Sequence, residues 1–157
     1  AAGRNYTVVI TSDHGFEQID FAFNPVAFAA AEKVKLNVKL AAGLALAMDT
    51  ESAAFFRATR GVGREVPRKE LGDFAPELVD GVAAAFEPAD RYEFTTASKE
   101  PYIKVGRGEH GLWPGRPDYR SILIVSGSGV KSRDLATLSL LNVYSRLRSL
   151  LGLAQTH

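Results

Sequence analysis

The stretch Thr7–Phe16 constrains the fold most strongly, because an apolar, β-branched run ends there abruptly in Ser-Asp-His-Gly. The run Tyr6–Ser12 is continuously apolar rather than alternating, which is typical of a strand buried on both faces of a parallel sheet. Asp13 and His14 follow directly at its carboxyl end. The sequence therefore predicts a buried strand that presents a carboxylate and an imidazole side by side.

The rest of the chain alternates between expected strands and helices. We expect helices starting at Asn24-Pro25, over 76–86 and over 138–151, short strands or a hairpin within 36–56, strands from Arg91 and over 119–126, and a long loop over 99–116. Strands interleaved with helices predict an α/β architecture. In open α/β sheets ligands bind beyond the carboxyl ends of the strands, where Asp13 and His14 are expected.

Composition excludes several kinds of site and partner. The chain has no cysteine, which excludes disulfides, thiolate metal sites and a cysteine nucleophile. Its net charge of +1 creates no global field that favours nucleic acid, and no apolar run approaches the roughly 20 residues that span a bilayer. The chain begins without methionine and enters a strand almost at once, so we expect a start made by cloning or cleavage, and the compartment stays open.

The three histidines are the main candidate metal ligands. His14 and His110 each precede a glycine, whereas His157 is the last residue and is expected to be a frayed end. A small residue after a ligand lets the backbone approach a metal closely, and carboxylate with imidazole suits a first-row divalent ion. Adjacent ligands on one strand end also suit a site with two metals. In the alternative interpretation, Asp13 caps the following turn and His14 bonds locally.

Three segments carry a resemblance to a known family. TVVITSDHGF, GEHGLWPGRPDYRSILIVSGSGVK and LLNVYSRLRSLLGL are similar to the Ser-Asp-His-Gly strand end, a later His-Gly segment and the closing helix of the alkaline phosphatase superfamily, in its type I phosphodiesterase/nucleotide pyrophosphatase branch. Their order and separation also fit. The similarity covers both ends of the chain, while the middle from about 33 to 104 is only loosely similar.

The resemblance implies a fold, a cofactor and a reaction. The fold would be an α/β alkaline phosphatase-like sandwich with a central, mostly parallel sheet flanked by helices. The cofactors would be two divalent metal ions, preferably Zn²⁺, with Asp13 and His14 on one ion and His110 on the other. Two such ions clamp the attacking and leaving oxygens of an in-line displacement. The implied substrate is a phosphate ester, with a phosphodiester or nucleotide pyrophosphate preferred over a monoester.

The chain departs from the family pattern upstream of Asp13. Family members also need an earlier Asp ligand, a Thr or Ser nucleophile and a further Asp/His pair, yet the twelve residues before Asp13 contain no acid and no histidine. We therefore interpret 1–157 as the C-terminal part of a larger hydrolase, inactive alone, whose missing N-terminal half supplies these groups. Without that half, a sheet edge and apolar faces would stay uncovered.

Two further alternatives concern the loop around His110 and the activity itself. Trp113 and Tyr119 flank this loop, where they could stack on a base or aryl leaving group of the substrate, or pack the loop against the core. The rival function is a non-catalytic, truncated domain that packs against a partner and binds no metal. Convergence of Asp13, His14 and His110 would favour the metal site.

Overall fold

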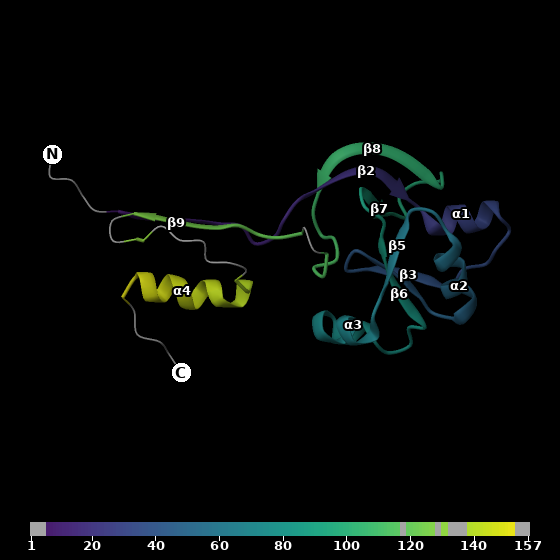
Figure 1. The fold of residues 1–157 in the computed structure, drawn as a ribbon. Helices are drawn as coiled ribbons and strands as arrows, with labels where there is room; N and C mark the ends of the chain where they lie inside the picture. Colours follow the sequence, from purple (N-terminus) through teal and green to yellow (C-terminus); the bar gives the residue numbers. More distant parts are fainter. Residues whose placement is uncertain (1–5, 117–118, 128–129, 132–137, 153–157) are drawn as a thin grey trace. The chain divides into compact units, whose positions relative to one another are not determined.

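The computed structural model describes residues 6–116, 119–127, 130–131 and 138–152, which belong to two compact units (Figure 1). Unit 1 combines Ala1–Gly15 with Arg120–His157, and unit 2 is Phe16–Tyr119. Unit 2 is therefore inserted into the chain between the two segments of unit 1. The loosely similar middle segment, 33–104, falls wholly inside unit 2.

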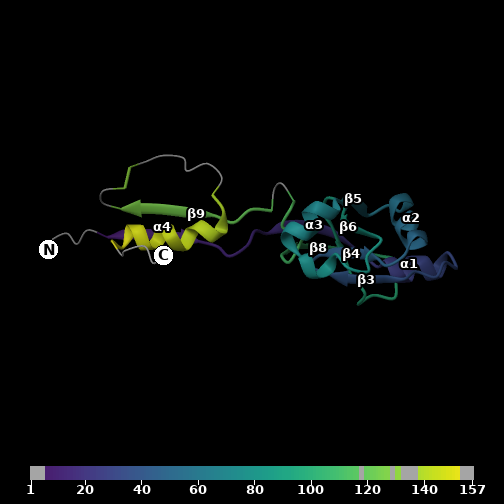
Figure 2. The same cartoon turned by 90° about the horizontal axis from the view of Figure 1, so that it is seen from below.

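Unit 1 is built on a two-stranded antiparallel ribbon. Strand β1 (Thr7–Thr11) pairs with β9 (Leu123–Gly127), with Ile10 directly opposite Ile124. A short 3₁₀ turn, η2 (Leu140–Asn142), leads into helix α4 (Val143–Leu150), and both views place this helix along one face of the ribbon (Figures 1 and 2). The expected strands and closing helix are thus present, but β9 begins four residues later than expected and α4 five residues later.

The other face of this ribbon is apolar, and no described element of unit 1 covers it. Its side chains Val8, Ile10, Ile122 and Ile124 are each about half exposed. The alternate residues Val9, Leu123 and Val125 are less exposed. The prediction of a strand buried on both faces is therefore wrong, because only one face of β1 has a covering layer among the described residues.

The larger sheet of unit 2 has four strands in antiparallel order β3-β4-β6-β5. The strands are β3 (Val38–Ala41), β4 (Leu44–Ala47), β5 (Val62–Val66) and β6 (Ala84–Pro88). Helix α2 (Thr50–Ala58) packs Phe56 against Ala45 on one face, while α3 (Arg68–Phe74) packs Leu71 against Leu46 on the other. Both central strands are consequently buried at every residue.

A second sheet of unit 2 has the order β7-β2-β8. Strand β2 (Glu17–Phe23) pairs in parallel with β7 (Tyr92–Phe94) and antiparallel with β8 (Tyr102–Glu109). The β2–β8 register shifts between Ile19 and Phe21, where β8 has one extra residue. Helix α1 (Pro25–Ala31) follows β2, and its first turn is capped by Asn24, whose side-chain oxygen accepts from the N–H groups of Val26 and Ala27. This confirms the helix start expected at Asn24-Pro25.

The predicted fold class is wrong. The expected alkaline phosphatase-like sandwich has a central, mostly parallel sheet, whereas the described strands form small antiparallel and mixed sheets in which β2–β7 is the parallel pairing. An apolar run indicates that a strand is buried but not in which direction its neighbour runs. The sequence of the run therefore does not distinguish a parallel from an antiparallel partner.

Two segments also differ from their expected secondary structure. The helix expected over 76–86 is a single 3₁₀ turn, η1 (Pro76–Leu78), followed by strand β6, which lies between β4 and β5. Alanine favours helices locally, but two-sided burial in a sheet overrides that preference. The loop expected over 99–116 contains β8, which β2 recruits as a partner.

Candidate functional site

The end of β1 is fixed to the opposite strand by Ser12. Its backbone N–H donates to the carbonyl of Ile122 at 3.2 Å, and its Oγ accepts from the N–H of Ile122 at 3.0 Å. The serine of the Ser-Asp-His-Gly motif thereby extends the ladder by one residue beyond β1. These two bonds fix the backbone directly before Asp13 and His14.

Gly15 provides the second fixed point of this strand end. A Cβ atom at Gly15 would lie 2.7 Å from the carbonyl oxygen of Arg120 and 3.0 Å from its nitrogen, so only glycine allows this approach. A glycine that follows a potential ligand is expected to allow close approach of a metal. For Gly15 the close neighbour is instead the backbone of Arg120, three residues before β9, which packs against the turn.

Between these two points, His14 and Asp13 form an adjacent pair of potential metal ligands. The Nδ1 atom of His14 lies 3.0 Å from the carbonyl oxygen of Gly15, which can only accept, so a hydrogen bond here is made by the tautomer with its proton on Nδ1. Nε2 lies 3.5 Å from Oδ1 of Asp13. Two ligands of a tetrahedral zinc ion lie about 3.4 Å apart when each bond is roughly 2.05 Å long. The 3.5 Å contact is an ion pair when the imidazole is protonated, and its length is also close to the separation of two ligands on one metal ion.

Exposure is also suited to binding an ion from solution. The side chain of Asp13 is 87% exposed and that of His14 is 35% exposed. The carboxylate can thus rotate toward an incoming ion, while the imidazole is held by its hydrogen bond to Gly15. A carbonyl acceptor on the non-ligating nitrogen is the usual way in which proteins orient a metal-binding histidine.

His110 lies in unit 2, directly after β8. Its ring meets the edge of Phe16 at a centroid distance of 5.7 Å, and its backbone N–H donates to Oε1 of Glu109. That bond, with one from Arg107, lowers the pKa of the Glu109 carboxyl. The next residue, Gly111, has a φ of +78°, a conformation that favours glycine, and its N–H donates to the Tyr119 hydroxyl at 2.8 Å.

The three predicted ligands are divided between the two units. Asp13 and His14 are neighbours in unit 1, and His110 belongs to unit 2, so the structure describes the two parts of the predicted site separately. Within the described ranges, no group of three or more His, Asp or Glu side chains could hold a metal ion. The terminal His157 lies outside these ranges.

Both aromatic residues near His110 take part in loop packing. Trp113 is 1% exposed and belongs to the core that α3 covers, where its ring meets the edge of Phe74. Tyr119 is partly buried, and its hydroxyl accepts the bond from Gly111. Trp113 therefore packs the loop against the core, which is the alternative to stacking on a substrate.

An ion-pair network beneath this loop had no signal in the sequence. Arg64 donates two bonds to Glu70, at 2.7 and 2.8 Å, and approaches Glu87 at 2.6 Å. Arg64 lowers the pKa of Glu70, whereas burial raises the pKa of Glu87. Oε2 of Glu87 accepts no hydrogen bond from the residues that the structure describes. Such networks join residues that are close only after folding.

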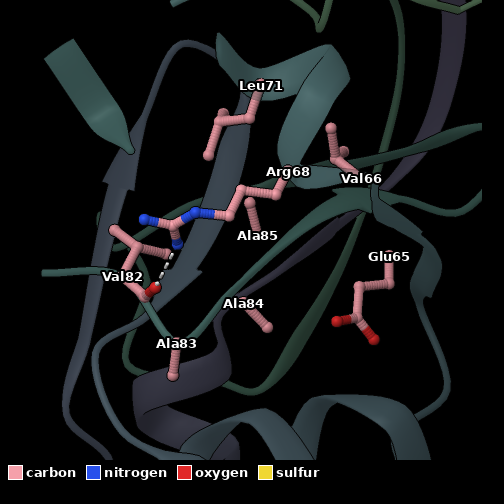
Figure 3. Close-up of a pocket in the computed structure, with 8 residues that line it drawn as sticks. All are labelled: Glu65, Val66, Arg68, Leu71, Val82, Ala83, Ala84 and Ala85. Atoms are coloured by element: carbon pink, nitrogen blue, oxygen red, sulfur yellow. Dashed lines mark hydrogen bonds between the residues drawn. The ribbon is translucent and has the colours of Figure 1, made fainter. Parts of the chain in front are cut away.

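A small hollow in unit 2 is not a nucleotide pocket. It measures about 70 Å³ and is lined mainly by alanines and other apolar residues of β5, α3 and the start of β6 (Figure 3). The guanidinium of Arg68 lies across it and bonds the carbonyl of Val82 at 3.4 Å. Sites for ligands of nucleotide size usually measure about 300–1,000 Å³, so this hollow is far too small.

Comparison with known proteins gives no match: no family model, curated protein or solved structure is similar to the chain. Among the helices of the described residues, none is long and apolar enough to cross a membrane.

Proposed function

We propose that this chain contributes part of a divalent-metal site to a phosphoric ester hydrolase. The observation that carries the proposal is the 3.5 Å separation of His14 Nε2 and Asp13 Oδ1 at a strand end that Ser12 and Gly15 hold in place. Carboxylate and imidazole are a normal donor set for zinc, and their spacing fits one ion. The resemblance of the flanking motifs to phosphodiesterases supplies the reaction class.

In the proposed site each residue of the Ser-Asp-His-Gly motif has a separate task. Asp13 and His14 bind one ion, Ser12 and Gly15 fix the backbone that carries them, and His110 is assigned to a second ion. When bound, two such ions neutralise phosphate charge and stabilise the attacking and leaving oxygens. The chain itself therefore binds and orients, while the Thr or Ser nucleophile and the remaining ligands come from residues outside these 157.

The uncovered face of unit 1 supports the need for a further segment. Val8, Ile10, Ile122 and Ile124 are about half exposed on one side of the ribbon, which leaves apolar surface that a complete enzyme would bury. We assign this face to the missing N-terminal half of the same hydrolase. The proposed substrate is a phosphodiester or nucleotide pyrophosphate, chosen on resemblance.

One observation favours the rival function, a truncated domain that binds no metal. In the described parts of both units, potential ligands occur in groups smaller than three. Structural zinc sites have four protein ligands, and catalytic ones commonly have three. Metal binding by the isolated chain is therefore expected to be weak. The two functions are distinguished by whether the dissociation constant changes when Asp13 or His14 is replaced.

The test is a Zn²⁺ titration of the chain and of three variants, with the dissociation constant measured by competition with a chelating dye. We expect Asp13→Asn and His14→Ala each to weaken binding at least tenfold. Asp80→Asn, which removes one exposed carboxylate elsewhere, is the matched control and should leave binding unchanged. Equal affinity in all four proteins would overturn the proposed metal site.

A further inference from the structure

The segment after His110 is anchored at both of its ends. His110 follows Glu109, which lies opposite Glu17 in the β2–β8 ladder. Six residues later, Arg116 returns to the same place, where it donates to Oε1 of Glu17 at 2.7 Å and to the carbonyl of Pro88 at 3.0 Å. Segment 110–116 is therefore a closed loop whose two ends meet at Glu17.

The middle of this loop is buried in the core of unit 2. Leu112 and Trp113 are 6% and 1% exposed, and the indole N–H of Trp113 donates to Oε1 of Glu70 at 2.7 Å. A Cβ atom at Gly43, in the β3–β4 turn, would lie 2.7 Å from the carbonyl oxygen of Gly111, so the loop rests directly on that turn. A Cβ atom at Gly115 would collide with the same Glu70 carboxylate.

Glu70 is itself fixed by a charge. The bidentate bond from Arg64 holds both of its carboxylate oxygens, and Arg64 is held in turn by Glu87. A bidentate pair of this kind fixes orientation as well as distance. The carboxylate that receives the indole N–H is therefore oriented by two bonds from Arg64, and it anchors Trp113, three residues from His110.

We propose that Glu70 and Trp113 are positioning residues for His110: they hold loop 110–116 so that the imidazole is presented to a metal ion in one orientation. The proposal rests on the proposed function, because it takes His110 to be a metal ligand. Neither residue touches the ion. Their effect passes through Leu112 and Gly111, whose positive φ fixes the direction in which the loop leaves His110.

The test compares variants of Glu70 and Trp113 in the whole chain with two measurements. Amide hydrogen exchange of Gly111 and Leu112, with the NMR shifts of the His110 ring beside Phe16, reports loop order without metal. Zn²⁺ affinity reports the consequence for binding. We expect Trp113→Phe, which removes the N–H donor and keeps an aromatic ring, to speed exchange and weaken binding about tenfold, as groups that orient ligands commonly do.

Glu70 gives a conservative rescue. Glu70→Ala should loosen the loop like Trp113→Phe. Glu70→Gln keeps an oxygen for the indole N–H but loses one of the two Arg64 bonds, so it should retain more order and affinity than Glu70→Ala. Phe56→Leu, on the opposite face of the sheet, is the control for lost stability alone, and it should leave His110 unchanged. Unchanged exchange and shifts in Trp113→Phe and Glu70→Ala would overturn the positioning role.

His110→Ala separates this proposal from the function on which it rests. If this variant binds Zn²⁺ as tightly as the parent chain, His110 is not a ligand, and the proposed role toward a metal is overturned together with that assignment. If it weakens binding while Trp113→Phe changes neither loop order nor affinity, the ligand assignment stands and the positioning role alone is overturned.

Discussion

The guanidinium of Arg116 donates to the carboxylate of Glu17 at 2.7 Å, and this pair joins residues 99 positions apart in the chain. The Arg116 side chain is 6% exposed and that of Glu17 is 24% exposed, so the pair is largely removed from water. Because Glu17 is paired with Glu109 in the ladder, this contact ties the end of the His110 loop to its beginning.

Replacing Arg116 should therefore be costly. Arg116→Met leaves the Glu17 carboxylate without its buried cation, and we expect the free energy of unfolding of unit 2 to fall by about 3 kcal/mol. Urea unfolding monitored by Trp113 fluorescence measures this. Removing both charges in Arg116→Met/Glu17→Met should recover much of the loss, since no unpaired charge remains. A double variant as unstable as the single one would show that lost packing, not charge, is responsible.

Gly15→Ala should damage the strand end of unit 1. The added methyl group would meet the backbone of Arg120 at 2.7 Å, and neither chain can yield without disturbing the hydrogen bonds between Ser12 and Ile122. We expect a loss of about 1–3 kcal/mol in unfolding free energy, typical of overpacking. Amide exchange of the β1 and β9 residues measures it.

Gly72→Ala is the matched control for that substitution. Gly72 lies within α3, and its added methyl group would meet Val79 at an ordinary 3.7 Å. Alanine is favoured over glycine inside helices, so this variant should gain about 0.5–1 kcal/mol. Equal effects at the two glycines would contradict the close approach at Gly15.

The contribution of Glu70 should depend on pH. Arg64, together with the indole of Trp113, holds the pKa of Glu70 below its ordinary value of 4.5, so the folded chain binds fewer protons there than the unfolded chain. The resulting stability is complete above pH 4.5 and is lost as the pH falls through the lowered pKa. Glu70→Gln should lack this contribution.

Urea unfolding of the parent chain and Glu70→Gln from pH 3 to 7 measures this dependence. The difference in unfolding free energy between the two proteins should be greatest near neutrality and should shrink below about pH 4.5, the ordinary range of a glutamate. A difference that stays constant across this range would mean that the Glu70 carboxylate has no stabilising charge interaction.

Local chemistry made several features predictable from sequence. Asn24-Pro25 starts a helix because an Asn side chain can satisfy the first N–H groups while proline needs no partner there. The β-branched run before Asp13 forms a strand, and the motif Ser-Asp-His-Gly places its two donors at the end of that strand. Each of these outcomes depends on residues within a few positions of one another.

Strand partners and the contacts of the His110 loop were decided by tertiary structure. The antiparallel pairing of β1 with β9, the strand formed by the alanine-rich segment 84–88, and the contact of Trp113 with Glu70 all join segments far apart in sequence. An apolar residue is buried equally well against many neighbours, so its identity does not select one. The sequence by itself determined which potential metal ligands follow the strand. Only the folded chain decided which distant backbone and carboxylate groups fix the strand end and the His110 loop.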